Sequence, residues 1–318
     1  MAEGSAPTPT ETPIVAIVGP TAAGKTSLSL ELAERLGGEV VNTDAMQLYR
    51  GMDIGTAKLP PAERRGIPHH LLDRLEVSEP ATVAEFQGWA REVIASLRAD
   101  GRAPVLVGGS ALYTRAVLDR FDFPGTDPAL RAKWEAELDA RGAAPLHALL
   151  AERDPEAAAR IQPDNGRRVV RALEVIELTG RPFSATLPRQ EYVEPATVQV
   201  GVRIDRALLE QRIEARVAEM FAAGLVEEVE RLLDEGLADG RTASRAIGYQ
   251  QVMTHLAGEL SLAEAQERTV IATRQFARRQ MAWWKDDPRI TWVEHDAPDR
   301  VEQALSSIVS EVRSTMGA

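Results

Sequence analysis

The sequence contains no cysteine and only five histidines among its 318 residues. The absence of cysteine excludes disulfides and thiolate metal sites, and the histidines show no spacing that is typical of metal ligands. Any metal is therefore expected to be magnesium that is bound through phosphate groups.

Long apolar runs are also missing. No segment approaches 18 consecutive apolar residues, and the polar start MAEGSAPTPTETP lacks the basic and then apolar order of a signal peptide. We therefore expect a cytoplasmic protein without membrane contact, with a disordered tail over residues 1–12. The net charge of −11 argues against a nucleic-acid partner for the chain as a whole, although such an average can hide a local basic face.

Short apolar runs alternate with helical patterns over residues 13–120, and 44% hydrophobic residues suffice for a large core. The run PIVAIVG (13–19) stops at a glycine loop, and KTSLSLELAERLG (25–37) has helical spacing. Further strands are predicted at 38–44, 68–73 and 104–109, with a helix at 83–101. This alternation predicts an α/β fold, in which a parallel sheet with flanking helices binds its ligand at the carboxyl ends of the strands.

The pattern changes over residues 121–195, where no buried strand is found. Helical stretches at 127–142 and 165–180 both end at a glycine, so we predict an all-helical insertion domain. Residues 196–318 are predicted to complete the core, beginning with a strand and continuing in C-terminal helices that break at Gly224.

The segment GPTAAGKT fits G-x-x-x-x-G-K-[ST], the loop (P-loop) whose backbone N–H groups and lysine bind a chain of phosphates. Its position between a strand and a helix places the helix dipole at the anion, and the Thr26 hydroxyl can ligate Mg²⁺. The predicted phosphate-binding residues are Gly19, Pro20, Thr21, Ala22, Ala23, Gly24, Lys25 and Thr26.

The acid that an ATPase needs at the end of a buried strand is absent from PVLVGG, which ends in Gly108 and Gly109. Asp44, after EVVNT, is the only comparable acid, and its position fits a metal ligand, a general base or a structural cap. The polar, glycine-rich segment 44–58 fits a loop at the mouth of the site or a solvated connection.

Two basic helices stand out against the acidic average. In GRRVVRALEVIELTG (166–180), Arg167 and Arg171 share a helix face with Glu174. Such a face could bind the phosphate backbone of a nucleic acid, or it could be a solvated face with an ion pair. In the segment 268–289, Arg274 and Arg278 also share a face.

Three aromatic side chains could stack on bases. For Trp283 and Trp284 a place in the core is the preferred interpretation. Tyr249, in SRAIGYQQV, fits either base stacking or packing at a helix start.

Seven segments in family order resemble the tRNA dimethylallyltransferases, also called tRNA isopentenyltransferases. They are GPTAAGKT, NTDAMQLYRGMDIGTAK, IPHHLLD, VLVGGSALY, RRVVRALEVIELTG, ASRAIGYQQV and FARRQMAWWK. The resemblance spans nearly the whole chain, and it implies transfer of a dimethylallyl group from dimethylallyl diphosphate to N6 of the adenine 3′ of the anticodon.

The resemblance also implies roles for individual residues. Asp44 would accept the N6 proton, while Lys25, Mg²⁺ and Ser110 would stabilise the departing diphosphate. The resemblance implies tRNA contacts at Asp44, Ala45, Met46, Gln47, Ser110, Arg131, Arg167, Arg168, Val169, Val170, Arg171, Arg245, Gly248 and Tyr249. We also expect contacts at Arg274 and Arg278, because they share a basic helix face. Ser110 and Ala111 stand where the family usually has threonine and glycine, which keeps the hydroxyl but adds bulk nearby.

Two other functions stay open from sequence. A small-molecule kinase would consume ATP and would need an acid near Gly108, whereas a prenyltransferase for free adenine nucleotides has no use for a basic insertion helix. The expected partners are the tRNA anticodon stem-loop and dimethylallyl diphosphate, with the protein acting as a monomer.

Overall fold

The computed structural model describes residues 12–121, 123–186 and 190–316, so the predicted tail over residues 1–11 lies outside the described residues. Thr12, which the prediction assigned to the tail, is buried, and its carbonyl accepts a hydrogen bond from Arg98 Nε at 3.0 Å. The chain divides into two compact units. The core unit comprises the chain up to Leu118 and from Tyr192 onward, and the helical unit comprises Asp119–Glu191, where the predicted insertion ran from 121 to 195.

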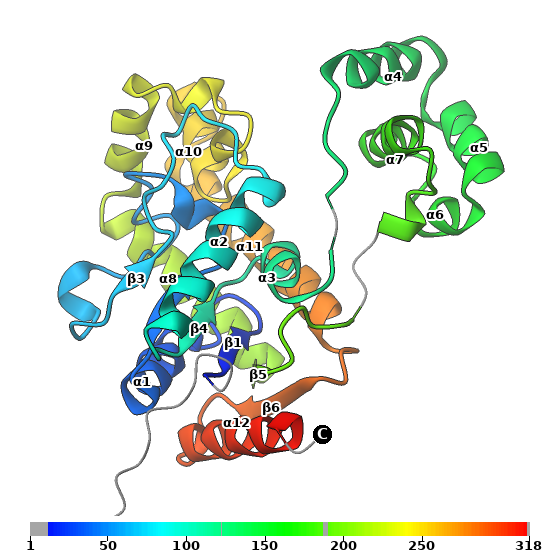
Figure 1. Cartoon of the computed structure of the whole chain (residues 1–318). Coiled ribbons are helices and arrows are strands. Elements are labelled where there is room, and N and C mark those ends of the chain that lie inside the picture. The colour runs from blue at the N-terminus through cyan, green and yellow to red at the C-terminus, as the bar shows by residue number, and fades with distance from the viewer. Residues whose placement is uncertain (1–11, 122, 187–189, 317–318) are drawn as a thin grey trace, which may run out of the picture. The chain divides into compact units, whose positions relative to one another are not determined.

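The core unit contains a six-stranded sheet in which every pairing is parallel (Figure 1). The strand order β3-β2-β4-β1-β5-β6 brings β1 to the middle, between β4 and β5. The strands are β1 Ile14–Val18, β2 Glu39–Asn42, β3 His69–His70, β4 Pro104–Val107, β5 Thr197–Arg203 and β6 Ile290–Glu294. The α/β prediction with a parallel sheet is confirmed.

Alternate residues of the central strands enter two different cores, as the period of two in a strand requires. Ile14 and Ala16 pack on the face that α2 covers, whereas Val15 and Ile17 pack on the face that α1 and α12 cover (Figure 1). Both faces are buried, which explains why these strands read as continuous apolar runs.

The helices of the core unit include the two predicted at residues 25–37 and 83–101 and one at residues 111–118 that was not predicted. They are α1 Lys25–Leu36, α2 Val83–Ala99, α3 Ala111–Leu118, α8 Arg206–Ala222, α9 Leu225–Asp234, α10 Tyr249–Leu256, α11 Leu262–Trp284 and α12 Arg300–Met316. Short 3-10 helices are Met46–Leu48, Pro61–Glu63, Leu237–Asp239 and Ala243–Arg245. The predicted break at Gly224 is confirmed, because this glycine has φ 99° between α8 and α9, a conformation that other residues rarely adopt.

One strand was not predicted. The basic helix α11 ends at Trp284 rather than at Arg289, and β6 follows as an edge strand beside β5. The five residues ITWVE expose Thr291 and Glu294, so they lack the continuous apolar run that marked the inner strands.

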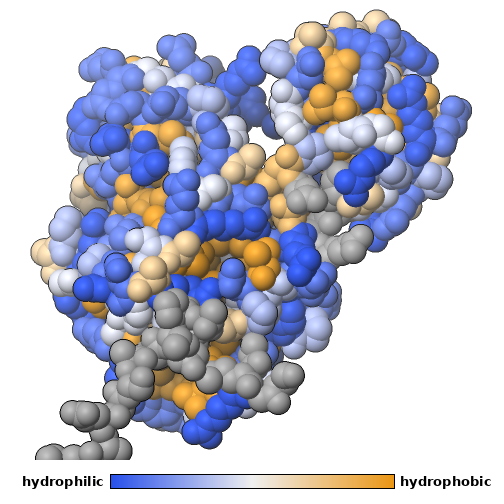
Figure 2. Space-filling view, in the orientation of Figure 1, coloured by the Kyte–Doolittle hydropathy of each residue, from blue (hydrophilic) through white to orange (hydrophobic). Residues whose placement is uncertain are grey.

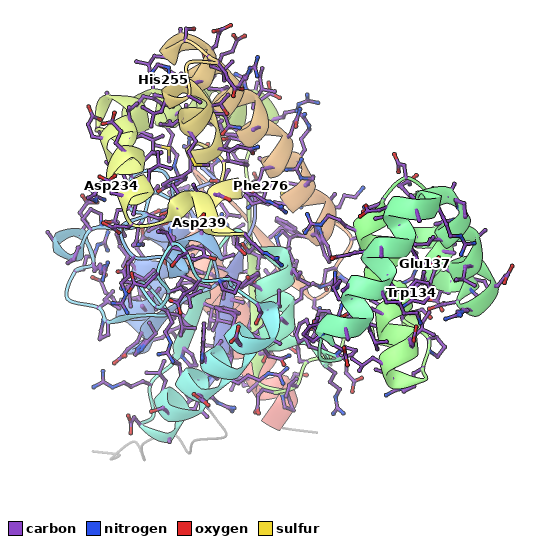
Figure 3. All side chains as sticks on the ribbon, turned by 90° about the horizontal axis from the view of Figure 1, so that it is seen from above. Trp134, Glu137, Asp234, Asp239, His255 and Phe276 are labelled. Carbon is purple, nitrogen blue, oxygen red and sulfur yellow. The ribbon has the colours of Figure 1, made fainter. Side chains whose placement is uncertain are left out.

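Over residues 123–186 the helical unit shows four α-helices and a short 3-10 helix, Ser184–Thr186. The α-helices are α4 Pro128–Arg141, α5 Ala143–Arg153, α6 Pro155–Arg160 and α7 Gly166–Thr179. They share a core of their own that includes Trp134 on α4 (Figure 3), Leu146 on α5 and Leu173 on α7. A separate core means that this unit does not depend on the sheet for its packing.

On the face that Figure 2 shows, hydrophilic residues cover most of each unit, and hydrophobic residues gather in smaller areas. In the part of the chain that the structure describes, no helix is long and apolar enough to cross a membrane.

Candidate active site

The phosphate loop connects β1 to α1 at the carboxyl edge of the sheet. Gly19 has φ 136° and lies so close to β5 that an added Cβ would meet the Val202 carbonyl oxygen at 2.9 Å. Gly24, with φ 95°, directly precedes α1, so the N-terminus of that helix faces the loop. These two glycines therefore provide the close approach and the tight turn that a phosphate loop needs.

Lys25 is buried at the start of α1, and its Nζ donates to the Pro20 carbonyl at 2.7 Å. Burial, with a smaller contribution from the charge of Arg216, lowers the pKa of Lys25 to about 8, although the Asp44 carboxylate acts in the opposite direction. A buried ammonium of this kind gains from an anionic ligand, because the ligand replaces part of the lost hydration.

The phosphate loop opens into a cavity of about 790 Å³. Lys25, Thr26 and Asp44 line it together with Arg212 and Arg216 of α8. The exposed side chain of Thr26 lies on the cavity wall next to Lys25. In the described residues no group of three His, Cys, Asp or Glu side chains could hold a metal ion, so a metal here would depend on ligand phosphates and the Thr26 hydroxyl.

Asp44 follows β2 at the same edge of the sheet. Its backbone N–H donates to Asn42 Oδ1 at 2.8 Å, and its Oδ1 accepts from the Met46 N–H at 3.0 Å. One carboxylate oxygen thus caps the backbone N–H of Met46, the first residue of the short helix that follows, while Oδ2 lies near Gly109, where an added Cβ would be 3.5 Å away. A structural cap and a second, reactive oxygen are therefore compatible in one residue.

Ser110 lies between β4 and α3. Its hydroxyl oxygen accepts from the Ala45 N–H at 3.2 Å, which leaves the hydroxyl proton for donation to a ligand. The unusual Ala111 is buried in an apolar cluster with Val18 and Trp284. The extra methyl group is accommodated by this cluster rather than directed at the site.

A second cavity of about 340 Å³ adjoins the first. Ser110, Arg245 and the α11 side chains Thr273, Phe276 (Figure 3) and Arg279 line it. Both cavities are lined by Thr21, Ala22, Asp44, Thr56, Arg216 and Met220. The carboxylate of Asp44 is thus shared between a phosphate-binding cavity and a second, smaller cavity.

Sequence reasoning missed three polar side chains at this site. Arg216 donates to Thr21 Oγ1 at 3.3 Å. Gln280 forms hydrogen bonds with the Thr21 N–H and the Gly109 carbonyl, and Glu228 accepts hydrogen bonds from the loop 53–55. Burial lowers the pKa of Arg216, and the Asp44 carboxylate opposes that shift. The i,i+4 spacing of Arg212 and Arg216 on one helix face was the available signal.

Comparison with known proteins identifies the family. The family model described as IPP transferase matches residues 47–287. A tRNA dimethylallyltransferase of Nocardioides sp. is 70% identical over 305 residues, which cover 96% of this chain and 98% of that protein. Another, from Streptomyces coelicolor, is 60% identical over 289 residues, covering 91% and 92%. The chain belongs to the IPP transferase family.

Solved structures agree with this assignment. The full-length tRNA isopentenylpyrophosphate transferase of Bacillus halodurans matches with a TM-score of 0.71 at 39% identity, covering 96% of this chain and 98% of that one. A eukaryotic dimethylallyltransferase acting on tRNA matches with a TM-score of 0.81 at 26% identity, covering 95% and 80%.

The structure corrects four of the expected tRNA contacts. Tyr249 is fully buried, and its hydroxyl donates to Glu228 Oε1 at 2.5 Å, so its ring packs in the core and does not stack on a base. Val169 and Val170 are buried in the core of the helical unit and cannot contact a ligand through their side chains. Gly248 is also buried, at the start of α10.

The arginines of the helical unit fall into two pairs. Arg131 and Arg171 both bind Glu174 Oε2, at 2.6 and 3.0 Å, and the Glu174 side chain is fully buried. Arg171 Nη2 also donates to the Pro124 carbonyl at 2.6 Å. Arg167 and Arg168 are instead exposed on α7. The first pair neutralises a buried carboxylate, and the second pair is free to meet an anionic ligand.

The remaining expected contacts differ in accessibility. Ala45, Met46 and Arg245 line the second cavity, and Gln47 lines the first. On α11, Arg278 is exposed, whereas Arg274 pairs with Glu214 at 3.0 Å. Trp284 is buried as predicted, but the prediction for Trp283 was wrong, because 43% of this residue is exposed.

Proposed function

We propose that this protein transfers the dimethylallyl group of dimethylallyl diphosphate to N6 of adenine 37, just 3′ of the tRNA anticodon. The products are N6-isopentenyladenosine in tRNA and diphosphate. The observation that carries this proposal is the shared wall of the two cavities, where Asp44 faces both the phosphate-loop side and the smaller cavity. A donor and an acceptor can therefore approach one carboxylate from two sides.

The acceptor needs help from a base, because the lone pair of an exocyclic adenine amine is delocalised into the ring. In the proposed reaction N6 attacks C1 of the allylic chain, the C1–O bond breaks, and its electron pair passes to the diphosphate oxygen. Asp44 Oδ2 accepts the proton from N6, while Oδ1 keeps its bond to the Met46 N–H.

The leaving diphosphate gains negative charge as the C1–O bond breaks. Gly24, Lys25 and Thr26 of the phosphate loop line the cavity that would hold it, together with Arg216. The Ser110 hydroxyl proton can be donated to its bridging oxygen. Mg²⁺ bound to the diphosphate and to Thr26 would neutralise further charge. This set of groups stabilises a leaving group and requires no nucleotide hydrolysis.

The RNA contacts are assigned to exposed cations. Arg167 and Arg168 of the helical unit, and Arg245 and Arg278 of the core unit, offer charges to the phosphate backbone of the anticodon stem-loop. The target adenine leaves its stack to reach Asp44, at a cost of a few kcal/mol that is smaller in a loop than in a duplex. A monomer is sufficient for this arrangement, since the residues lining both cavities come from one chain.

The test is incubation of the protein with labelled dimethylallyl diphosphate, Mg²⁺ and either tRNA or AMP. Label in tRNA without ATP is the expected result, and its loss on chelation of Mg²⁺ would support the metal assignment. Label in AMP alone would favour a free-nucleotide acceptor. ATP turnover without prenyl transfer would favour a kinase and would refute the proposal.

A further inference from the structure

Gln280 lies between two loops of the candidate active site but has no role in the reaction proposed above. Its side chain projects from α11 into the protein, and the residue is only 3% exposed. Oε1 accepts the Thr21 N–H at 2.8 Å, and Nε2 donates to the Gly109 carbonyl at 2.7 Å. One amide thus joins the phosphate loop to the turn that carries Ser110.

Both hydrogen-bond partners of the Gln280 side chain belong to loops that face the candidate active site. The Thr21 N–H belongs to the phosphate loop, yet it binds a side chain and is thereby withdrawn from phosphate binding. The Gly109 carbonyl immediately precedes Ser110, and an added Cβ at Gly109 would meet Gln280 Nε2 at 2.3 Å. The glycine at 109 therefore makes room for the amide, and the close fit fixes the distance between the two loops.

The helix that carries Gln280 also shapes the second cavity. Phe276 lies one helical turn before Gln280, and Thr273 and Arg279 line the same cavity. The second cavity, the phosphate loop and the turn that carries Ser110 are consequently all contacted by one helix, α11.

We propose that Gln280 is a positioning residue that holds the phosphate loop and Ser110 at the spacing at which both act on the same leaving diphosphate. This inference rests on the proposed function. A displacement of about 1 Å in such an arrangement can cost up to about a hundredfold in rate. The rate of the chemical step therefore depends on Gln280 more strongly than donor binding does, since binding needs only the phosphate loop.

The experiment uses two replacements of Gln280. Methionine keeps the length of the side chain and removes both hydrogen bonds. Glutamate retains an acceptor for the Thr21 N–H but places an oxygen against the Gly109 carbonyl. Gln275→Met is the matched control, because Gln275 is exposed on the same helix. Transfer to tRNA, titration with inorganic diphosphate and the melting temperature are measured for each variant.

Gln280→Met and Gln280→Glu are expected to lower kcat about tenfold or more, with KM for the donor and the Kd of diphosphate changed less than about threefold. Because Gln280 acts through Ser110, Gln280→Met in a Ser110→Ala background should cost less than about threefold. Gln275→Met should match the wild type.

An unchanged kcat, or an equal loss in both backgrounds, would overturn the inference and leave Gln280 a purely structural amide. If Gln280→Met does not fold, Gly109→Ala probes the same contact from the other partner, with the same kcat loss expected. A wild-type chain that transfers no label to tRNA would instead refute the proposed function itself, so the two failures are distinguishable.

Discussion

Replacement of Asp44 by asparagine separates the structural role of this residue from its proposed role as a base. Oδ1 caps the Met46 N–H, and Oδ2 is the oxygen assigned to accept the N6 proton. An asparagine can keep the first contact through its amide oxygen, but it cannot accept a proton at the second position. Asp44→Ala loses both, so the difference between the two variants measures the cap.

The expected loss for Asp44→Asn follows from general base catalysis, which contributes about 10²–10⁴ in rate, or about 3–5 kcal/mol of transition-state stabilisation. The cap should add only about 1 kcal/mol of stability, lost in Asp44→Ala alone. Diphosphate binding should not weaken in Asp44→Asn, because Lys25 and Arg216 lose a competing negative charge.

The assay is transfer of label from dimethylallyl diphosphate to tRNA at saturating donor, together with titration of inorganic diphosphate and urea unfolding of each variant. Turnover of Asp44→Asn within about threefold of the wild type would refute the base assignment. Weaker diphosphate binding by Asp44→Asn would show instead that the carboxylate organises the phosphate site.

Three further predictions concern binding and stability. Replacing Arg167 and Arg168 by alanine should weaken tRNA binding and reduce the salt slope by about 1.4–1.8 units; an unchanged slope would contradict the assignment. Glu228→Ala should cost about 2–4 kcal/mol in urea unfolding, because three backbone N–H groups and the Tyr249 hydroxyl lose their buried acceptor, whereas Glu228→Gln should cost less. Burial would raise the pKa of Asp154, but hydrogen bonds from Ser184 and the α6 backbone outweigh it and lower the pKa below 3.8. The ionised Asp154 carboxylate therefore stabilises the fold above pH 3.8, and this stabilisation is lost as the pH falls through the lower pKa of the folded state. Asp154→Asn should abolish this pH dependence when the free energy of unfolding is measured at several pH values.

The parts of the fold that follow local rules could be predicted from the sequence. The phosphate loop, the inner strands and the break at Gly224 each depend on a short pattern with one physical cause. The edge strand β6 was missed because its pattern is short and partly exposed. The errors at Val169 and Val170 arose because a motif was transferred as a block. Helical periodicity turns Val169 away from Arg167, but Val170 is three positions from Arg167, and its burial depends on the helices that pack against α7.

Gln280 and Glu228 could not be found in this way. Gln280 meets Thr21 and Gly109 across 259 and 171 positions of the chain, and Glu228 meets the loop 53–55 across 173 to 175. Local periodicity specifies which face of a helix is buried but not which distant loop lies against it.

The end of β4 explains why a phosphate loop can serve prenyl transfer here. An added Cβ at Gly108 would lie 2.3 Å from the Thr43 carbonyl carbon and 2.6 Å from the Asp44 nitrogen, and at Gly109 it would collide with Gln280. An acidic residue at either position, as hydrolysis of a nucleotide would favour, would therefore displace the backbone that carries Asp44 or the amide that holds Ser110. The two glycines leave the Asp44 carboxylate, just after β2, in the wall that the two cavities share. In that place it can act on an acceptor rather than on a metal, and the phosphates in the loop become a leaving group.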